Sequence, residues 1–441
     1  MAATGIARQA LLLLFRRIVA IYFRRVEVAG ELPTRNTGGR LFAANHVNAL
    51  VDPILVLTQA PCVISPVAKS TLWKIPGLRW LLDAADAVPI VRRRDNPTKT
   101  DKDNEAVFER VASHLGRGGN ILIFPEGTSH NEPHLLALRS GAGRMLGKSH
   151  EEGVRNLTFQ AVALEFDARD VFRSRSLVLF GPARNVDDLA DAPDVAQAIT
   201  EKLASDLAEL LVEGTTWDER MLIVRVAELF ANEGDDRTLE GHNRIGRRIE
   251  EARYKLTKTD PSTLGALETN VRAYFYALDD ALLHDRDVVR FAKKHAGAPA
   301  RPRSSRLLLL GGLPLAVVGM VLYWLPYQLP RLVTRKLQGD PDVASTYKLG
   351  VGLLVFPIWA TLLLVAAGKL LGGTALAVAV AIVVTTPFAA LPWLDRLDRF
   401  AASFRSFASL RNRTTELSAL AEQRTRVLAD LEAARVRAEG V

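Results

Sequence analysis

Short apolar runs alternate with helical patterns along residues 40–182. The runs predict buried strands at 41–44, 63–67, 87–91, 121–124, 159–166 and 177–180. Between them, apolar positions recur at helical spacing, most clearly from about Asn104 to Leu115, where Gly116 to Gly119 then closes the helix. This alternation predicts an α/β domain in which helices cover a central sheet.

The pattern becomes helical from residue 186 to 300. Three-to-four spacing of apolar positions predicts helices at 195–211, 217–232 and 263–283. No catalytic motif stands in this region, so we predict a helical packing or regulatory domain. Residues 296–305 are rich in Pro, Gly and Arg, which indicates a linker.

Long apolar segments follow at about 307–325, 349–367 and 373–394. Each is close to the twenty residues that cross a bilayer as a helix, which predicts membrane association. The loop after the first of these segments contains arginines and lysines, and the C-terminal tail contains arginines. The positive-inside bias therefore places the loop and the tail in the cytoplasm. We therefore favour two spans over three: the first segment, interrupted by Gly311-Gly312-Leu313-Pro314, would be re-entrant or interfacial, and the others would form a hairpin around Gly372-Gly373.

Both ends of the chain are predicted to be helical. Near the N-terminus the apolar stretch is interrupted by arginines that share one half of the helical wheel: Arg16, Arg17, Arg24 and Arg25. This favours an interfacial helix, and a packed helix that caps the catalytic domain is the alternative. The tail has a partly heptad-like seam, too short to predict a coiled-coil dimer, at Leu410, Leu417, Leu420, Val427, Leu428 and Leu431.

These patterns predict a chain of five parts. They are an N-terminal amphipathic helix at 1–30, a catalytic domain at 31–185, a helical domain at 186–300, membrane segments within 306–395 and a helical tail at 396–441.

Net charge and apolar content limit the classes of partner that this protein is expected to bind. The formal net charge of +8 fits a nucleic-acid binder or a protein held against anionic lipid. The apolar segments favour lipid, and no nucleic-acid-binding signature is present, so we expect a membrane lipid partner and no nucleic acid. Cys62 is the single cysteine, which excludes an intrachain disulfide and a cysteine cluster for zinc.

His46 and Asp52 are the first candidates for chemistry. A histidine titrates near neutral pH and can take a proton from an alcohol that attacks a carbonyl. A carboxylate on the other ring nitrogen fixes the tautomer and stabilises the imidazolium. Asp52-Pro53 also has the form of a helix start, with Asp52 as N-cap and Pro53 at the first helical position. The two roles are compatible, since helix starts lie at the rim of a sheet.

A second polar turn, Pro125-Glu126-Gly127-Thr128, follows the apolar run at 121–124. It delivers a carboxylate and a flexible glycine to a strand end. Such a turn can direct backbone N–H groups at a phosphate or an oxyanion, although an isolated Pro-Glu-Gly is usually an ordinary turn.

Cations follow two other predicted strands. Arg92, Arg93 and Arg94 come directly after the run at 87–91, where they could clamp a phosphate, or could be solvated surface. Lys69, after the run at 63–67, is a weaker candidate of the same type.

The order of these motifs resembles that of the phospholipid/glycerol acyltransferase family, over about residues 40–185. The family has a His-x-x-x-x-Asp box, a Pro-Val-x-Arg box, a Pro-Glu-Gly-Thr/Ser box and a Val-Pro-Val-Gly-Leu-like strand, which is similar to Ala161-Val162-Ala163-Leu164 here. The resemblance implies direct transfer of a fatty acyl group from an acyl-CoA or acyl-carrier-protein thioester to a glycerol hydroxyl, with no cofactor or metal. His46 would be the base and Asp52 its orienter. The resemblance implies that Arg92, Glu126 and Gly127 form the acceptor site, and we add Thr128 and Lys69 as candidate substrate-binding residues.

This chain departs from the family pattern at two points. Five residues, not four, separate His46 from Asp52, and Ala161 stands where the family often has proline. The longer interval is similar to that of yeast-type glycerol-3-phosphate/dihydroxyacetone-phosphate acyltransferases and their bacterial relatives, as are the stretches 126–131 and 172–182. The acceptor is therefore expected to be glycerol 3-phosphate or lysophosphatidate.

Other activities stay open. Another lysolipid could be the acceptor, the domain could be a non-catalytic lipid-binding scaffold, or water could replace the acceptor in a hydrolase. An acyl-enzyme is not expected, because Cys62 has no motif around it and no Gly-x-Ser-x-Gly elbow is present. Since acyl donors are made in the cytoplasm, the catalytic domain is expected to face it from the inner membrane.

Overall fold

The computed structural model describes residues 2–33, 38–91, 105–234, 236–295, 304–337 and 341–439. The chain forms two compact units. The first comprises Met1–Glu213 with Asp340–Thr346, and the second comprises Gly214–Gly339 with Tyr347–Val441.

A seven-stranded sheet organises the first unit, in the spatial order β1-β7-β6-β2-β5-β3-β4. Its strands are β1 (Arg25–Gly30), β2 (Arg40–Ala44), β3 (Ser65–Lys69), β4 (Val88–Ile90), β5 (Asn120–Ile123), β6 (Thr158–Phe166) and β7 (Arg175–Asn185). Neighbouring strands are parallel except β6 and β7, which are antiparallel. The carboxyl ends of β2, β3, β4, β5 and β6 therefore lie at one edge of the sheet.

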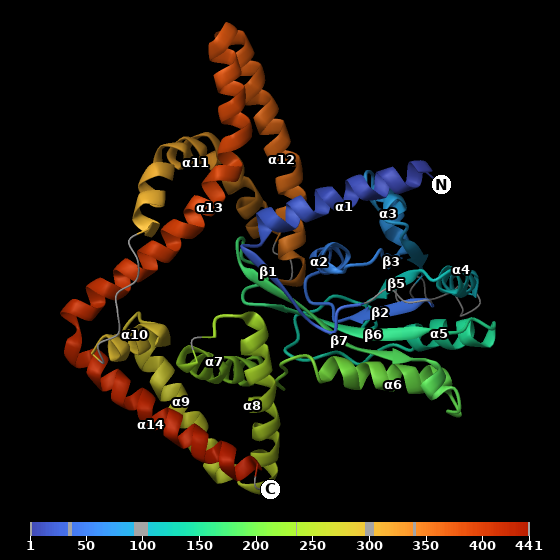
Figure 1. Cartoon of the computed structure of the whole chain (residues 1–441), viewed down its shortest axis with the longest axis horizontal. Coiled ribbons are helices and arrows are strands. Elements are labelled where there is room, and N and C mark those ends of the chain that lie inside the picture. The colour runs from blue at the N-terminus through green and yellow to red at the C-terminus, as the bar shows by residue number, and fades with distance from the viewer. Residues whose placement is uncertain are drawn as a thin grey trace. The chain divides into compact units, whose positions relative to one another are not determined.

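Helices cover both faces of this sheet (Figure 1). One face carries α1 (Ala2–Tyr22), α2 (Val51–Gln59) and α3 (Leu78–Ala84), and the other carries α4 (Glu105–Gly116), α5 (Gly141–Glu151) and α6 (Val195–Ala208). Short 3₁₀ helices stand at η1 (Ser70–Lys74) and η3 (Asp187–Leu189). Because side chains alternate along a strand, Leu41 enters the core under α4–α6 while Phe42 packs edge-to-face on Phe180.

The predicted α/β class and the predicted strands are confirmed, with two corrections. The N-terminal helix ends at Tyr22, and Arg25–Gly30 forms β1, parallel to β7, where we expected helix to residue 30. Charged and apolar residues alternate from Arg25 to Val28, which is a strand pattern, but it continues the basic and apolar stretch that we assigned to the helix. The boundary expected at residue 185 moves to Glu213, because α6 contributes the buried Ile199 and Leu203 to the sheet core.

Helix α1 packs on the first unit along one side only. Leu11 and Ile18 are buried, whereas Ile6, Leu13 and Leu14 are exposed. The packing confirms the capping alternative for this helix. Its contact with a membrane surface stays a prediction, to which the exposed apolar side chains contribute.

The second unit is helical. Its helices are α7 (Trp217–Glu233), α8 (Leu239–Thr259), α9 (Pro261–Asp280), α10 (Asp285–His295), α11 (Ser304–Leu337), α12 (Pro341–Leu370, which begins in the first unit), α13 (Gly373–Asn412) and α14 (Thr414–Glu439). Among the residues that the structure describes, three helices are long and apolar enough to cross a membrane, at Leu310–Leu337, Pro341–Leu370 and Gly373–Asp398. Helix α11 is continuous through Gly311–Pro314 and curves (Figure 1), as its internal prolines lead one to expect. The choice between two and three spans stays a prediction.

The tail helix α14 packs within its own unit. Leu417, Leu420 and Val427 from the heptad-like seam are buried against apolar residues of α7, α9 and α10. The seam therefore closes a helical core. Polar contacts accompany it: Arg424 donates to Asp285 Oδ1 (2.8 Å) and Glu233 Oε2 (2.7 Å), and Tyr274 Oη also donates to Asp285 Oδ1 (2.7 Å).

We expect Arg424→Met to destabilise the helical unit by about 3–5 kcal/mol, because it leaves the buried Asp285 carboxylate without its cationic partner. Thermal unfolding of the detergent-solubilised chain measures this. Arg435→Met is the matched control on the same helix, since Arg435 pairs with Glu432 at the surface and its loss should leave the transition unchanged. Equal unfolding temperatures for the two variants would contradict the role given to Arg424.

Candidate active site

The site lies where parallel strands end. The loop after β2 carries His46, the loop after β5 carries Glu126, and the loop after β6 carries Arg169. Ligands of open α/β sheets bind at this carboxyl edge, because loops from several strands converge there. Hydrogen bonds join all three loops: His46 N–H donates to Glu126 Oε1 (2.6 Å), and the Arg169 guanidinium donates to Val47 O (3.1 Å) and to His130 O (3.4 Å).

His46 and Asp52 form a hydrogen-bonded pair. His46 Nδ1 lies 2.9 Å from Asp52 Oδ2, and the imidazole stacks on the Phe124 ring at 4.1 Å between centroids. The side chain of Asp52 is fully buried, whereas that of His46 is 19% exposed. With Nδ1–H donated to the carboxylate, Nε2 is left as the basic nitrogen. The pair therefore has the geometry of a general base and its orienter.

The same carboxylate oxygen organises the loop between the two residues. Asp52 Oδ2 also accepts from Val47 N–H (2.8 Å) and from Asn48 N–H (2.7 Å). Helix α2 begins at Val51, so Asp52 is its second residue and not the N-cap we expected from Asp52-Pro53. The carboxylate accepts from amides that precede the helix. It therefore fixes the loop and does not cap the helix.

Burial raises the pKa of the Asp52 carboxyl, while the bonds from His46 and from the two amides act in the opposite direction. Its second oxygen, Oδ1, is buried and has no hydrogen-bond partner among the described residues. The folded protein therefore stabilises this carboxylate through one oxygen only.

Glu126 lies within the Pro125–Thr128 turn, and its side chain is buried. Its Oε1 accepts from His46 N–H, and its Oε2 accepts from Leu136 N–H (2.9 Å) and is hydrogen-bonded to His130 Nε2. Because Glu132 N–H donates to His130 Nδ1 (3.1 Å), His130 carries its proton on Nε2 and donates it to Glu126. The carboxylate thus ties the two loops together, and its contact with an acceptor stays a prediction.

Gly127 closes the turn, donating its N–H to Phe124 O (3.0 Å). Its φ of +75° suits glycine, and a Cβ there would lie 2.6 Å from Arg139 Nε, so no larger residue fits without displacing Arg139. Thr128 follows with its hydroxyl 3.2 Å from Ser129 O. Arg139 is exposed and packs over the turn, donating from Nε to Glu126 O (3.4 Å).

Of the other residues singled out in the sequence, the structure describes Lys69 and Cys62 but not Arg92. Lys69 is the half-buried last residue of β3, beside β5, at the same sheet edge. Arg92, with Arg93 and Arg94, lies outside the described residues, so its role stays a prediction. Burial raises the pKa of the Cys62 thiol, which makes a thiolate nucleophile there less accessible.

Sequence reasoning missed Arg169, His130 and Arg139. Arg169 stands three residues after a predicted strand, a weaker form of the signal that drew attention to Arg92, which follows its run directly. His130 stands in the stretch 126–131 that we quoted for its resemblance to the yeast-type enzymes, but its spacing alone does not show that it reaches Glu126. Arg139 is distant from any motif, and only the fold brings it over Gly127.

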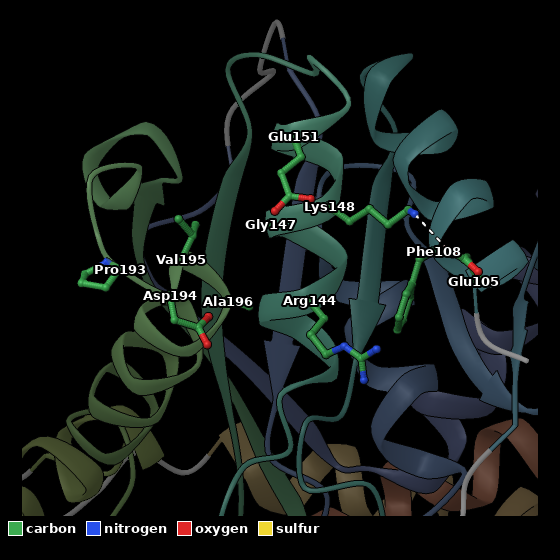
Figure 2. Close-up of a pocket in the computed structure, with 10 residues that line it drawn as sticks. All are labelled: Glu105, Phe108, Arg144, Gly147, Lys148, Glu151, Pro193, Asp194, Val195 and Ala196. Atoms are coloured by element: carbon green, nitrogen blue, oxygen red, sulfur yellow. Dashed lines mark ion pairs between the residues drawn. The ribbon is translucent and has the colours of Figure 1, made fainter. Parts of the chain in front are cut away.

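A cleft of about 530 Å³ lies elsewhere in the first unit, lined from α4, α5 and the start of α6 (Figure 2). Acidic and basic side chains alternate on its wall: Lys148 extends toward Glu105, 3.7 Å away, and Arg144 lies over the Phe108 ring. The cleft contains none of the predicted site residues, so we assign the chemistry to the edge that carries His46.

Comparisons with known proteins concern the domain that carries this edge. Residues 25–164 match the sequence model of the acyltransferase family, and the chain therefore contains an acyltransferase-family domain. It is 33% identical over 150 residues, 34% of this chain, to a lyso-ornithine lipid O-acyltransferase of Pseudomonas aeruginosa. It is 28% identical over 195 residues, 43% of this chain, to glycerol-3-phosphate O-acyltransferase 2 of Saccharomyces cerevisiae.

These matches span 51% and 26% of the length of the two relatives. Among solved structures, the 1-acyl-sn-glycerophosphate acyltransferase of Thermotoga maritima aligns over 47% of this chain and 81% of its own, with 17% identity and a TM-score of 0.35.

We predict that Asp52→Asn gains stability relative to the wild type as pH rises. Because burial raises the pKa of Asp52, the folded protein binds a proton more tightly than the unfolded chain does. The wild-type free energy of unfolding therefore falls as pH rises from the ordinary carboxyl pKa of about 4 through the raised value. Asparagine does not titrate. The unfolding temperature of the variant should therefore rise relative to that of the wild type from pH 4 to pH 8.

Asp206→Asn is the control, because its stability relative to the wild type should change with pH in the opposite direction. Burial opposes ionisation of Asp206, but hydrogen bonds from Arg184 and Lys202 prevail and lower its pKa. Ionised Asp206 stabilises the folded protein above the ordinary carboxyl pKa. The Asp206→Asn variant should therefore lose stability relative to the wild type from pH 4 to pH 8. Parallel pH profiles for the two variants would contradict the assignment for Asp52.

Proposed function

We propose that this protein is a membrane-bound O-acyltransferase. It moves a fatty acyl group from acyl-CoA or acyl-carrier protein to a hydroxyl of glycerol 3-phosphate or of 1-acylglycerol 3-phosphate. The observation that carries the proposal is the 2.9 Å pair of His46 Nδ1 and the buried Asp52, at the sheet edge of an acyltransferase-family domain.

The reaction proceeds in one transfer. The acceptor hydroxyl gives its proton to His46 Nε2 while its oxygen attacks the thioester carbonyl, and Asp52 stabilises the imidazolium that forms. Backbone N–H groups at the sheet edge stabilise the tetrahedral oxyanion. Collapse breaks the C–S bond, and the thiolate leaves with the proton from His46. The products are the acylated acceptor and the free thiol.

Cations around the same edge are the proposed ligands of the acceptor phosphate. Lys69 ends β3 at this edge, and Arg139 lies over Gly127. Arg92, which follows β4 in the sequence, lies outside the described residues and is proposed from its motif alone. Thr128 adds a hydroxyl. Glu126 acts one step further away, since its oxygens hold the His46 and His130 loops.

A lysolipid without a glycerol phosphate is the second candidate acceptor, and the similarity to a lyso-ornithine lipid O-acyltransferase favours it. We further propose that the first unit faces the cytoplasm at the inner membrane. Acyl donors are made there, and lysines and arginines flank the apolar segments.

We expect His46→Ala to lower kcat by about two to four orders of magnitude, because it removes the general base. The variant should remain folded, since the His46 ring is partly exposed, its backbone bond to Glu126 remains and Asp52 keeps its bonds from Val47 and Asn48. Initial rates with labelled palmitoyl-CoA and each acceptor measure the effect. Turnover like that of the wild type would remove His46 from the mechanism.

The acceptor is identified by offering the purified, detergent-solubilised protein glycerol 3-phosphate, 1-acylglycerol 3-phosphate or lyso-ornithine lipid, with palmitoyl-CoA or acyl-carrier protein as donor. Lysophosphatidate from the first acceptor would support the yeast-type activity, and phosphatidate from the second alone would support the later acylation. Product from lyso-ornithine lipid alone would favour the second candidate. Thioester loss without an acceptor would indicate a hydrolase.

A further inference from the structure

The first turn of α12 belongs to the unit that contains His46 and Asp52. Residues 340–346 belong to that compact unit, although the rest of the helix belongs to the second. Asp342, Ala344 and Ser345 are buried there, whereas the most apolar part of the helix has no buried residue. The start of an apolar helix is therefore packed against the acyltransferase domain.

Two hydroxyl groups of this turn bind the active-site loops. Ser345 Oγ donates to the backbone carbonyl of Arg169 (2.5 Å) and accepts from Tyr22 Oη (2.8 Å). Thr346 Oγ1 accepts from Leu50 N–H (3.1 Å). Ser345 is fully buried, so its bonds are shielded from competition with water.

The groups that these hydroxyls hold are close to the catalytic pair. Asn48 Nδ2 donates to the same Arg169 carbonyl (3.1 Å), and the backbone N–H of Asn48 donates to Asp52. The Arg169 side chain donates to Val47 O. One continuous set of hydrogen bonds thus runs from Ser345 through Arg169 and Asn48 to the Asp52 carboxylate.

The segment that receives these bonds is conformationally demanding. Ala49 has a φ of +38°, in a region that residues with a side chain rarely adopt. It lies between Asn48 and Leu50, both anchored from outside the loop, within the five-residue interval that exceeds the family spacing by one. A loop with a strained residue keeps its shape only where its surroundings fix it.

We propose that Ser345 and Thr346 are positioning residues of the acyltransferase, and that the first turn of α12 is a structural part of its active site. The turn holds the Asn48–Leu50 segment, which sets the distance between His46 and Asp52. The inference rests on the proposed acyl transfer for its kinetic consequence, but the support of the loop is a property of the fold that can be measured separately.

Thr346→Val and Ser345→Ala test the proposal, with Thr346→Ser as the conservative variant. Valine keeps the shape of threonine but cannot accept from Leu50 N–H, so we expect kcat to fall about tenfold with KM changed less than about twofold. Serine keeps the hydroxyl and should retain most of the activity. Thr361→Val is the matched control on the same helix, because the Thr361 hydroxyl donates to Pro357 O within that helix (2.9 Å), and the activity of this variant should be unchanged.

Hydrogen–deuterium exchange of the 46–52 segment provides the second measurement, on the same intact, detergent-solubilised proteins. Faster exchange confined to this segment in Thr346→Val and Ser345→Ala, but not in Thr361→Val, supports the proposal. Unchanged loop exchange, or a loss of kcat that Thr346→Ser fails to restore, overturns it. If the wild type acylates none of the offered acceptors, the proposed function fails, while the exchange result still decides whether α12 holds the loop.

Discussion

The site depends on one buried oxygen atom. Asp52 Oδ2 accepts three hydrogen bonds, from the His46 imidazole and from the amides of Val47 and Asn48. A carboxylate removed from water loses solvation, and the three donors replace part of it. Since this oxygen holds both the His46 ring and the loop that leads to α2, the tautomer and the direction of the proposed base follow from this single group.

The sheet supplies the frame on which this arrangement is built. Parallel pairing of β2 with β5 and with β6 brings three loops to one edge, and Glu126 and Arg169 then hydrogen-bond across them. Most of these contacts end on backbone atoms, so they set the path of the loops more than they select a side chain. Residues of this kind influence a reaction through geometry and not through contact with the substrate.

The sequence was sufficient for elements with strong periodicity and for chemistry that adjacent residues define. The strands of the α/β domain, the helix at Glu105–Gly116 and the proximity of His46 to Asp52 all follow from local pattern. Strand β1 was missed because its short alternation of charged and apolar residues directly continues the apolar, arginine-rich stretch of the N-terminal helix. The N-cap expected for Asp52 was wrong, because the carboxylate binds preceding amides that only the folded loop presents to it.

Contacts between distant segments could not be read from the sequence at all. Arg139 over Gly127, Arg169 across two loops and α14 in the helical core each depend on pairings that no local pattern encodes. Arg92 illustrates the reverse case, since its motif is clear in the sequence but it lies outside the described residues.

The place of Ser345 and Thr346 also bears on the order in which the chain folds. Leu50 and Thr346 are 296 positions apart, so the ribosome completes the whole sheet long before the turn that contacts its loop is made. The sheet and its covering helices can form as the chain emerges, because their contacts lie within the first half of the sequence. The loop between His46 and Asp52 reaches its final hydrogen-bonding only when α12 arrives. Completion of the hydrogen bonds around the candidate site is thereby tied to synthesis of an apolar helix that lies in the last quarter of the chain.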